Sequence, residues 1–334
     1  MSIIDNKIKH IAITRIDAMG DVILTLPVCI YLKLIVPDII ITVVGRSYTQ
    51  PLINSCTAVD HFINYDELEA LPKNEQIEVI KQKKIDVIVH QFSNKKITVL
   101  ARQAGIKIRI GRRVKLYNYI NCNRLVRLKR KSSDLHEAQQ MVYLLRPLGG
   151  IHVPTIGTIA NLYEDNFKSN TELPPTLNLY LDKDKFNLII HPKSNGHGYE
   201  WAMDNFTKLI QELPKEKFNI IITGSASEHL FFKTWIPLLP DHVIDLSGKM
   251  TLNELIAFVA KADGLLASGT GPLHLAAALG IHTLGLFPAE PRAINAIRWA
   301  PLGKKAEHIE CYYNDLSSIT VDVVFKKIMG WLQK

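Results

Sequence analysis

The sequence predicts an α/β protein built from two Rossmann-like domains. Short apolar runs alternate with segments of helical periodicity in both halves of the 334-residue chain, which is typical of parallel sheets covered by helices. A stretch rich in Pro, Asn and Thr separates the halves at residues 149–185. We expect the two domains to face a central cleft, with ligands at the carboxyl ends of the strands.

The first half begins with a buried strand at residues 11–14, which a loop at 15–20 joins to a helix at 21–36. A strand at 39–44 closes a βαβ unit. Further strands are expected at 85–90 and 106–110, and helices at 68–83 and 134–148. Together these elements predict a first domain at 1–150, followed by an interdomain linker at 151–185.

The second half alternates more regularly. Strands are expected at 187–191, 218–223, 242–246, 264–267 and 282–287. Helices are expected between them at 204–213, 227–239, 251–262 and 272–279, and a last helix at 321–332 has apolar residues at helical spacing. We expect a second domain at 186–320 and a C-terminal helix at 321–334.

The basic residues are concentrated in one region of the first half. The chain has 40 Lys and Arg against 32 Asp and Glu, a formal net charge of +8. Between Asp86 and Asp134 there is no acidic residue but there are thirteen cations, and without them 27 basic residues remain against the 32 acidic ones. This pattern predicts an anionic partner, such as a phosphorylated glycolipid or a membrane surface; a solvated basic face is the alternative. The run contains no nucleic-acid-binding motif, so we expect no nucleic acid. The thirteen are Lys95, Lys96, Arg102, Lys107, Arg109, Arg112, Arg113, Lys115, Arg124, Arg127, Lys129, Arg130 and Lys131.

The composition excludes several classes of protein. An apolar fraction of 47% with 22% charged residues is typical of a packed chain and not of a disordered one. The four cysteines lie far apart without a C-x-x-C pair, which indicates neither a zinc site nor a disulfide framework, and favours a reducing cytosol. The histidines show no paired ligand spacing, so we expect no metal and no cofactor.

Targeting and membrane segments are not expected either. Charged residues such as Lys7, Lys9 and Asp17 interrupt any signal-peptide core. The apolar segment at 22–36 is too short to span a membrane, and the one at 265–287 reads as strand, loop, helix, loop and strand. We therefore expect a cytoplasmic protein.

The first polar motif, residues 15–22, lies between the first strand and the first helix. Gly20 allows an unusual turn, and Asp21 is placed at the start of the helix. Asp21 has two interpretations. It is an N-cap that satisfies free backbone N–H groups, or it is a carboxylate that takes a proton from a substrate hydroxyl.

The second motif, residues 268–275, follows the strand at 264–267. Its glycines let the backbone approach a ligand, and the helix that begins near Pro272 offers N–H groups to a phosphate. The pattern nearly matches G-x-G-x-x-G, but His274 stands where the third glycine belongs, so nicotinamide binding is disfavoured. A plain tight turn is the alternative.

The third motif, residues 191–201, opens from a strand into a polar loop that contains glycine. Lys193, Ser194 and backbone amides are candidate phosphate ligands, although such loops often only connect elements.

In the fourth motif, residues 223–228, Ser227 is the expected N-cap of a helix and Glu228 lies in its first turn. Glu228 either compensates the helix dipole or binds a ribose.

In order and spacing, these motifs together resemble glycosyltransferase family 9, the heptosyltransferase-like enzymes of lipopolysaccharide core assembly. The resemblance covers nearly the whole chain. It is carried by residues 11–27, which are similar to the N-terminal signature of the family, and by residues 246–252 and 270–280, which are similar to its donor-domain signatures.

The resemblance implies a GT-B fold, with the acceptor in the first domain and a nucleotide sugar in the second. It further implies an inverting, metal-independent transfer, typically from ADP-heptose to a lipid A–Kdo core. By the same resemblance, Asp21 is the catalytic base, and the donor is contacted by Glu228, the backbone of Met250, and the diphosphate loop with Thr270, Gly271 and His274.

Two positions depart from the family pattern. The family usually has Lys two residues before the Trp of its second loop, and here that residue is Tyr199. It usually has Asp before Thr-Gly-Pro, and here that residue is Gly269. Lys193 is the nearest cation in the same loop, and we expect it to take over the phosphate contact.

We therefore predict a glycosyltransferase that acts on an anionic glycolipid, peripheral to the inner face of the cytoplasmic membrane. The rivals are a non-catalytic nucleotide-sugar or glycan-binding protein and a two-domain sugar-nucleotide epimerase. The expected acceptor-binding residues are Arg15, Arg112 and Arg113, and the expected donor-binding residues are Lys193, Ser194, Glu228, Met250, Gly269, Thr270, Gly271 and His274.

Overall fold

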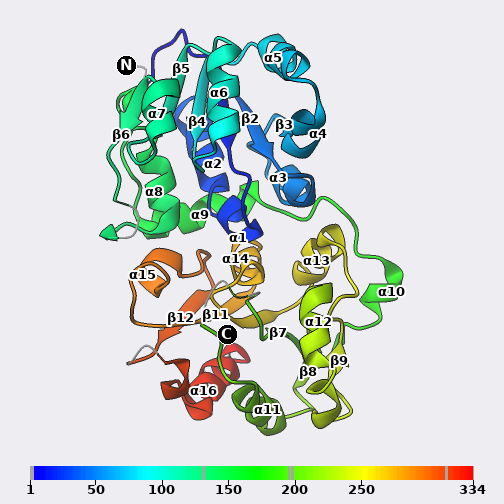
Figure 1. Cartoon of the computed structure of the whole chain (residues 1–334). Coiled ribbons are helices and arrows are strands. Elements are labelled where there is room, and N and C mark those ends of the chain that lie inside the picture. The colour runs from blue at the N-terminus through cyan, green and yellow to red at the C-terminus, as the bar shows by residue number, and fades with distance from the viewer. Residues whose placement is uncertain (1–3, 130–131, 195, 197–198, 313–314, 334) are drawn as a thin grey trace. The chain divides into compact units, whose positions relative to one another are not determined.

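The structure, a computed structural model, describes residues 4–129, 132–194, 196, 199–312 and 315–333. The chain divides into two compact units, Met1–Phe167 and Lys168–Lys334. Each unit holds one six-stranded sheet, and every strand pairing in both sheets is parallel (Figure 1). The predicted α/β class is confirmed.

The sheet of the first unit has the strand order β3-β2-β1-β4-β5-β6. The order reverses between β1 and β4, which is the switch point where ligands of such sheets bind. Its strands are β1 (His10–Thr14), β2 (Ile40–Gly45), β3 (His61–Asn64), β4 (Val87–His90), β5 (Ile108–Arg112) and β6 (Arg124–Val126). Its helices are α1 (Met19–Ile23), α2 (Leu26–Ile35), α3 (Gln50–Asn54), α4 (Tyr65–Ala70), α5 (Lys73–Gln82), α6 (Lys95–Gln103), α7 (Leu116–Asn121), α8 (Glu137–Tyr143) and α9 (Ile156–Asn166).

The sheet of the second unit repeats this topology. Its order, β12-β11-β10-β7-β8-β9, places the switch point between β7 and β10. Its strands are β7 (Phe186–His191), β8 (Phe218–Ile222), β9 (Ile244–Asp245), β10 (Gly264–Ser268), β11 (His282–Phe287) and β12 (Ala306–Glu310). Its helices are α10 (Pro175–Asn178), α11 (Met203–Glu212), α12 (Ala226–Phe232), α13 (Leu252–Val259), α14 (Gly271–Ala278), α15 (Ala296–Trp299) and α16 (Val321–Trp331).

Apolar side chains on both faces of each sheet form the cores. Strand β1 is buried at every position, as are β4 and β10, which fits strands that helices cover on both sides. In the second unit α16 packs beside α11, and Ile328 and Trp331 join the core. The C-terminal helix is thus part of the second unit.

The helix predicted at 21–36 is two helices, because Pro27 interrupts it. Proline has no backbone N–H, so it cannot donate to the carbonyl four residues earlier, which belongs to Ile23. The hydroxyl of Tyr163 on α9 donates to the Ile23 carbonyl instead, at 2.8 Å. The chain turns at Thr25, whose Oγ1 donates to the Asp21 carbonyl at 2.9 Å.

Tyr163 also shows that the predicted linker differs from the structure. Residues 156–166 form α9, which lies in the first unit against α2 and α8. The buried side chains of Ile159 and Tyr163 are four residues apart on one face of this helix. The Pro and Asn residues around this segment hid the short helical pattern.

Other differences have local causes. The helix predicted at 68–83 is divided by Pro72, which is the N-cap of α5. The strands β3, β6 and β12 were not predicted, because they are short sheet strands without a continuous apolar run. No helix in the described part of the chain is both long and apolar enough to cross a membrane.

Candidate active site

In the first unit, a buried arginine organises the carboxyl end of β1. The side chain of Arg15 is 0% exposed and contacts three carboxylates. Its Nε lies 2.6 Å from Asp17 Oδ1, its Nη1 lies 3.8 Å from Glu137 Oε1, and its Nη2 is ion-paired with Asp21 Oδ1. Burial lowers the pKa of Arg15, but Asp21, Asp17 and Glu137 together raise it by more, so the guanidinium remains a fixed cation.

This arrangement excludes one of the two interpretations of Asp21. The N-cap of α1 is Ala18, and Asp21 is the third residue of the helix, so the N-cap interpretation is wrong. The Asp21 side chain is 19% exposed, and one of its oxygens is held by Arg15. Asp21 is therefore an oriented, partly exposed carboxylate near the helix N-terminus, where negative charge is stabilised.

The structure places the predicted acceptor-binding arginines in different environments. Arg15 is buried and engaged with carboxylates, so a direct contact with an acceptor does not fit. Arg112 ends β5 and is 9% exposed, whereas Arg113 is exposed. Of the three, Arg113 presents its charge to solvent.

A buried histidine stands beside this cluster. His90 ends β4, is 1% exposed, and lies with its Nδ1 3.5 Å from Thr14 Oγ1. Burial, helped by the charge of Arg109, lowers the pKa of His90 to about 3. The ring is neutral at every pH at which the protein is expected to work.

His90 should make the protein acid-sensitive. In the unfolded chain a histidine binds a proton near its usual pKa of 6.5, whereas in the folded chain His90 binds one only near pH 3. The stability from neutral His90 is complete above pH 6.5 and is lost as the pH falls towards 3, by about 1.4 kcal/mol per pH unit. Urea unfolding at pH 6.5 and 5.5 should therefore show a steeper loss for the wild type than for His90→Asn. Equal slopes would remove His90 as the cause.

In the second unit, three loops meet at the switch point. The loop after β7 is anchored by Trp201, whose backbone N–H donates to Ser268 Oγ at the end of β10 (3.2 Å). The indole is 1% exposed and donates to the Ile319 carbonyl at 2.9 Å. His191, which ends β7, lies with its Nδ1 3.0 Å from Thr223 Oγ1, which follows β8. These contacts fix the loops of the third, fourth and second motifs against one another.

Lys193 is paired inside its own loop. Its ammonium forms an ion pair with the Glu200 carboxylate and lies 5.5 Å from the centre of the Phe231 ring. The other Glu200 oxygen accepts from the backbone N–H and hydroxyl of Ser194, at 2.8 and 3.0 Å. Burial raises the pKa of Glu200, but Lys193 and Ser194 lower it by more. The Glu200 carboxylate therefore stays ionised beside Lys193. Lys193 is 26% exposed and is not an isolated cation.

The fourth motif is a capping box, which corrects one expectation. The N-cap of α12 is Ser225 and not Ser227. Ser225 Oγ accepts from the Glu228 N–H at 3.2 Å, and Glu228 Oε2 accepts from the Ser225 N–H at 2.7 Å. Glu228 is 4% exposed, and its Oε2 also lies 3.7 Å from His191 Nε2. The helix-capping interpretation of Glu228 is thus what the geometry shows.

Met250 lies in a loop that packs closely on this helix. Gly248 has φ +70°, and a Cβ there would lie 3.2 Å from the Cα of Ala226. The backbone N–H of Gly248 donates to the Gly224 carbonyl at 2.8 Å. Met250 follows, half-buried, just before the capping box of Thr251 and Glu254 on α13.

Helix α14 begins differently from α12 and α13. Its N-cap residue, Thr270, has extended backbone (φ −143°, ψ 165°) and makes no side-chain capping bond among the described residues. Gly271 and Pro272 form the first turn, and His274 follows, 5% exposed, with its ring 6.3 Å from that of Trp299. Backbone N–H groups at such a helix start bind anions.

The family comparison covers most of the chain. A family model described as glycosyltransferase family 9 (heptosyltransferase) matches residues 76–327. The chain belongs to glycosyltransferase family 9. It is thus a glycosyltransferase, and the resemblance seen in the motifs is confirmed.

Relatives and solved structures agree with this family. A putative glycosyltransferase of Haemophilus influenzae is 27% identical over 307 residues, covering 90% of this chain and 88% of the relative. The crystal structure of a family 9 glycosyl transferase from Veillonella parvula has a TM-score of 0.81 at 20% identity, covering 100% and 99% of the two chains. The structure titled E. coli ADP-heptose lps heptosyltransferase II has a TM-score of 0.76 at 18% identity, covering 98% and 99%. The fold is therefore the GT-B fold of family 9.

The structure shows what surrounds Gly269, one of the two positions that differ from the family pattern. A Cβ on Gly269 would lie 3.0 Å from Cε1 of Phe287, a ring that is 1% exposed at the end of β11. Gly285 lies beneath the same ring, since a Cβ there would be 2.5 Å from Phe287 Cε2. A side chain at position 269 would therefore require the Phe287 ring to shift by a few tenths of an ångström. Tyr199, the other departure, is 42% exposed and directs no charge into the loop.

Sequence reasoning on this family 9 enzyme missed Asp17, Glu137 and Glu200 as partners of the expected site residues. Glu137 had a usable signal, because it shares a helix face with the buried Met141 four residues later. A carboxylate on a buried helix face indicates a buried cation. The Lys193–Glu200 pair had no such signal, because the loop that joins them has no regular spacing.

Proposed function

We propose that this chain transfers a sugar from a nucleotide diphosphate sugar, ADP-heptose first of all, to a glycolipid acceptor of the lipopolysaccharide-core type. The observation that carries the proposal is the Asp21 carboxylate, held by a buried Arg15 beside the switch point of the first unit. The choice of donor and acceptor is supported by the likeness to the E. coli ADP-heptose lps heptosyltransferase II.

The proposed reaction is a direct displacement without a metal. The acceptor hydroxyl oxygen forms a bond to the anomeric carbon, while the bond from this carbon to the diphosphate oxygen breaks. Asp21 takes the hydroxyl proton, and the nucleotide diphosphate leaves with the electron pair of the broken bond. Attack opposite the leaving group inverts the anomeric configuration. The described residues include no group of three or more His, Cys, Asp or Glu that could hold a metal ion.

On the donor side, the start of α14 is the proposed diphosphate site. Helices α12 and α13 satisfy their first N–H groups with capping boxes, whereas Thr270 makes no side-chain capping bond within the described part of the chain. The backbone N–H groups of Gly271, Leu273 and His274 can therefore stabilise the leaving diphosphate, whereas Pro272 has no N–H to donate.

The other expected donor-side residues are assigned roles in the same proposal. We place Ser194, Gly269 and the backbone of Met250 around the nucleotide. Glu228 is already engaged in its capping box, so we assign it to positioning the loop and not to direct contact. On the acceptor side, the exposed Arg113 attracts the anionic acceptor, with Arg112 behind it.

Lys193 and Glu200 should affect donor binding in opposite directions. If Lys193 contacts the diphosphate, Lys193→Ala should weaken diphosphate binding by about 1.5–3 kcal/mol, the range for hydrogen bonds to charged groups. Glu200→Gln removes the competing anion but keeps an oxygen for Ser194, so it should strengthen binding. Calorimetry with the nucleoside diphosphate and with the uncharged nucleoside measures both.

The nucleoside is the internal control for this pair of variants. Its affinity should change little in either variant, because it carries no phosphate charge. Equal losses for both ligands in Lys193→Ala, or weaker diphosphate binding in Glu200→Gln, would show that the pair only shapes the loop.

A thermal-shift screen of nucleotides and nucleotide sugars tests the proposed donor. A ligand that binds the folded state raises the midpoint temperature by mass action. ADP and ADP-heptose should stabilise the protein more than the UDP and GDP compounds do. Stabilisation without any turnover would favour the non-catalytic binding protein, which the residues at 199 and 269 also allow. Turnover of a nucleotide sugar without acceptor would favour the epimerase.

A further inference from the structure

Helix α7 has its polar and apolar faces reversed. A helix that covers a sheet normally buries apolar side chains and exposes polar ones. In α7 the buried side chains are the amides of Asn118 (0% exposed) and Asn121 (5%). The exposed ones are Leu116 (78%), Tyr119 (48%) and Ile120 (58%), which are spaced at i, i+3 and i+4 along one face.

Specific hydrogen bonds fix this orientation. Asn118 Nδ2 donates to the Arg112 carbonyl at 2.9 Å and to Ser93 Oγ at 3.2 Å. The Tyr117 hydroxyl donates to the Ser93 carbonyl at 2.8 Å, and Asn121 Nδ2 donates to the Tyr117 carbonyl at 2.8 Å. The bonds to Ser93 and Arg112 hold the helix with its apolar face outward, and a rotation about its axis would break them.

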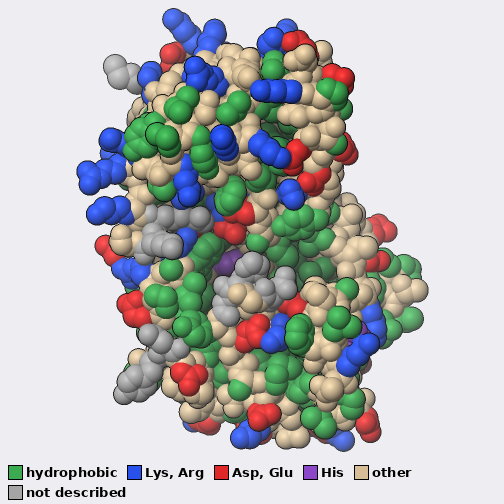
Figure 2. Space-filling model, viewed as in Figure 1, with side chains coloured by type: hydrophobic (Ala, Val, Ile, Leu, Met, Phe, Trp, Pro, Cys, Tyr) green, Lys and Arg blue, Asp and Glu red, His purple; other side chains and the backbone are tan. Residues whose placement is uncertain are grey.

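Cations surround the apolar face. Arg113 and Lys115 are exposed directly before the helix, and Val114 between them is 58% exposed. Arg102 on α6 donates to the Ile120 carbonyl at 3.3 Å. Figure 2 shows Lys and Arg side chains, with hydrophobic ones among them, over the part of the first unit where Figure 1 draws α6, α7 and β6.

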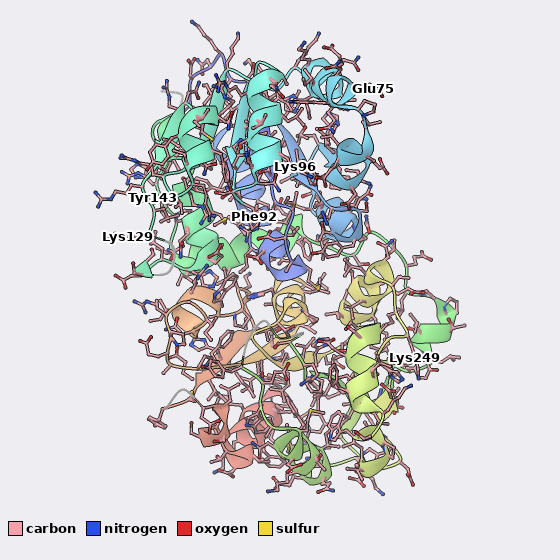
Figure 3. All side chains as sticks on the ribbon, in the orientation of Figure 1. Glu75, Phe92, Lys96, Lys129, Tyr143 and Lys249 are labelled. Atoms are coloured by element: carbon pink, nitrogen blue, oxygen red, sulfur yellow. The ribbon has the colours of Figure 1, made fainter. Side chains whose placement is uncertain are left out.

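The same side of the unit carries more positive charge beyond α7. Lys129, three residues after the end of β6, is exposed on the outer side of the unit (Figure 3). Arg130 and Lys131, the next two cations of the basic run, lie outside the described residues. No acidic residue occurs in the sequence between Asp86 and Asp134 to offset these charges.

We infer that this α7 surface, made of Val114, Leu116, Tyr119 and Ile120 with Arg113 and Lys115, docks on an anionic lipid bilayer. Apolar side chains of this size enter the boundary between headgroups and acyl chains, and a tyrosine is favoured at that depth. The flanking cations are attracted to anionic headgroups. Docking would bring the enzyme to its proposed glycolipid acceptor, but the lipid binding itself does not depend on the transfer reaction.

Charge complementarity selects the bilayer over a second copy of this chain. A symmetric dimer through α7 would place the same patch on both sides of the interface. The cations of one copy would then face those of the other, with no acidic residue of the run to pair with them. An anionic surface matches both the apolar face and the charge.

Vesicle co-sedimentation of the full chain tests the inference. The wild type should bind vesicles of phosphatidylglycerol and phosphatidylethanolamine, and bind pure phosphatidylcholine much less. Leu116→Ser with Ile120→Ser should weaken binding to the anionic vesicles about tenfold or more, because two apolar side chains no longer enter the lipid. Lys115→Gln with Lys129→Gln should weaken it about thirtyfold at low salt and less at high salt. The matched control is Leu34→Ser with Leu179→Ser, which removes leucines that are 65% and 83% exposed elsewhere, and it should bind as the wild type does.

The outcomes separate this inference from the proposed function. Sugar transfer to a water-soluble acceptor fragment should be unchanged in Leu116→Ser with Ile120→Ser. Vesicle binding without any transfer would leave the α7 surface standing and overturn the proposed function. Wild-type vesicle binding in that variant, or binding that ignores lipid charge, would overturn the inference. So would self-association in sedimentation velocity that the variant abolishes while no vesicle binding is seen.

Discussion

Asp21→Ala should lower the turnover of sugar transfer by about 100- to 10,000-fold, because the acceptor hydroxyl then lacks a base to take its proton. Nucleotide affinity should change little, since the residues proposed to bind the donor lie on the loops of the second unit. The two quantities are measured by release of the nucleoside diphosphate in steady state and by calorimetry. The rate loss should be the same at saturating donor and acceptor, because it reports the chemical step.

Asp17→Ala is the matched control for this prediction. Asp17 contacts the same guanidinium, at 2.6 Å, and has a similar exposure of 20% against 19% for Asp21. A variant that loses only electrostatic support should retain most of its turnover. If Asp17→Ala loses more than Asp21→Ala, the roles of the two carboxylates are exchanged. If nucleotide affinity falls as steeply as turnover, the loop has misfolded.

Arg15→Met should lower the free energy of unfolding by about 3–5 kcal/mol, the cost of removing one partner from a buried ion pair. Methionine fills most of the space but removes the guanidinium that lies 3.8 Å from the Glu137 carboxylate, which is 0% exposed. It also releases the oxygen of Asp21 that Arg15 holds, so turnover should fall together with stability. Urea unfolding and the transfer assay, both at pH 7.5, measure the two losses.

A second variant separates these effects. Arg15→Met with Glu137→Gln also removes the buried negative charge that faced Arg15 and should recover part of the lost stability. It should not recover turnover, because Asp21 still lacks the guanidinium that orients it. Recovery of both would show that Arg15 serves the fold alone, and no loss of stability in the single variant would contradict the buried network.

The sequence was most informative where strands are fully buried. β1, β4 and β10 are buried at every position and β7 at all but its first, and each is followed by a polar loop that the structure places at a switch point. The short strands β3, β6 and β12 have mixed burial, so their residues do not form a continuous apolar run. Two predicted helices are interrupted at prolines. A proline has no backbone N–H, so it breaks the helical hydrogen bonding even where the spacing of apolar residues continues.

The sequence predicted where the expected site residues lie but not which residues contact them. Asp21 lies in the first helix after β1, and Thr270 and Gly271 come just after β10, so strand order places all three near the carboxyl ends of strands. The partners that set their environment come from distant segments. Glu137 reaches Arg15 across 122 positions of the chain, and Tyr163 reaches Ile23 across 140. Long-range pairs of this kind leave no periodic pattern.

The sequence also did not reveal which groups pair with a lysine inside a polar loop. The ammonium of Lys193 was expected to be available for phosphate, but Glu200 in the same loop is paired with it. In the loop before α13, Lys249 likewise donates to a carbonyl of its own segment, that of Asp245 at 2.6 Å (Figure 3). A cation in a polar loop is therefore a candidate phosphate-binding residue only if nearby groups of the same loop do not already pair with it.

The most direct test of the proposed function is the anomeric configuration of the product. Purified protein is incubated with ADP-heptose and a Kdo-lipid A acceptor in the presence of EDTA, and the product is followed by NMR. The account predicts a new glycosidic bond of inverted configuration, formed only with acceptor present, with release of one ADP for each bond and loss of the reaction in Asp21→Ala. A product with retained configuration, or full transfer by Asp21→Ala, would contradict it.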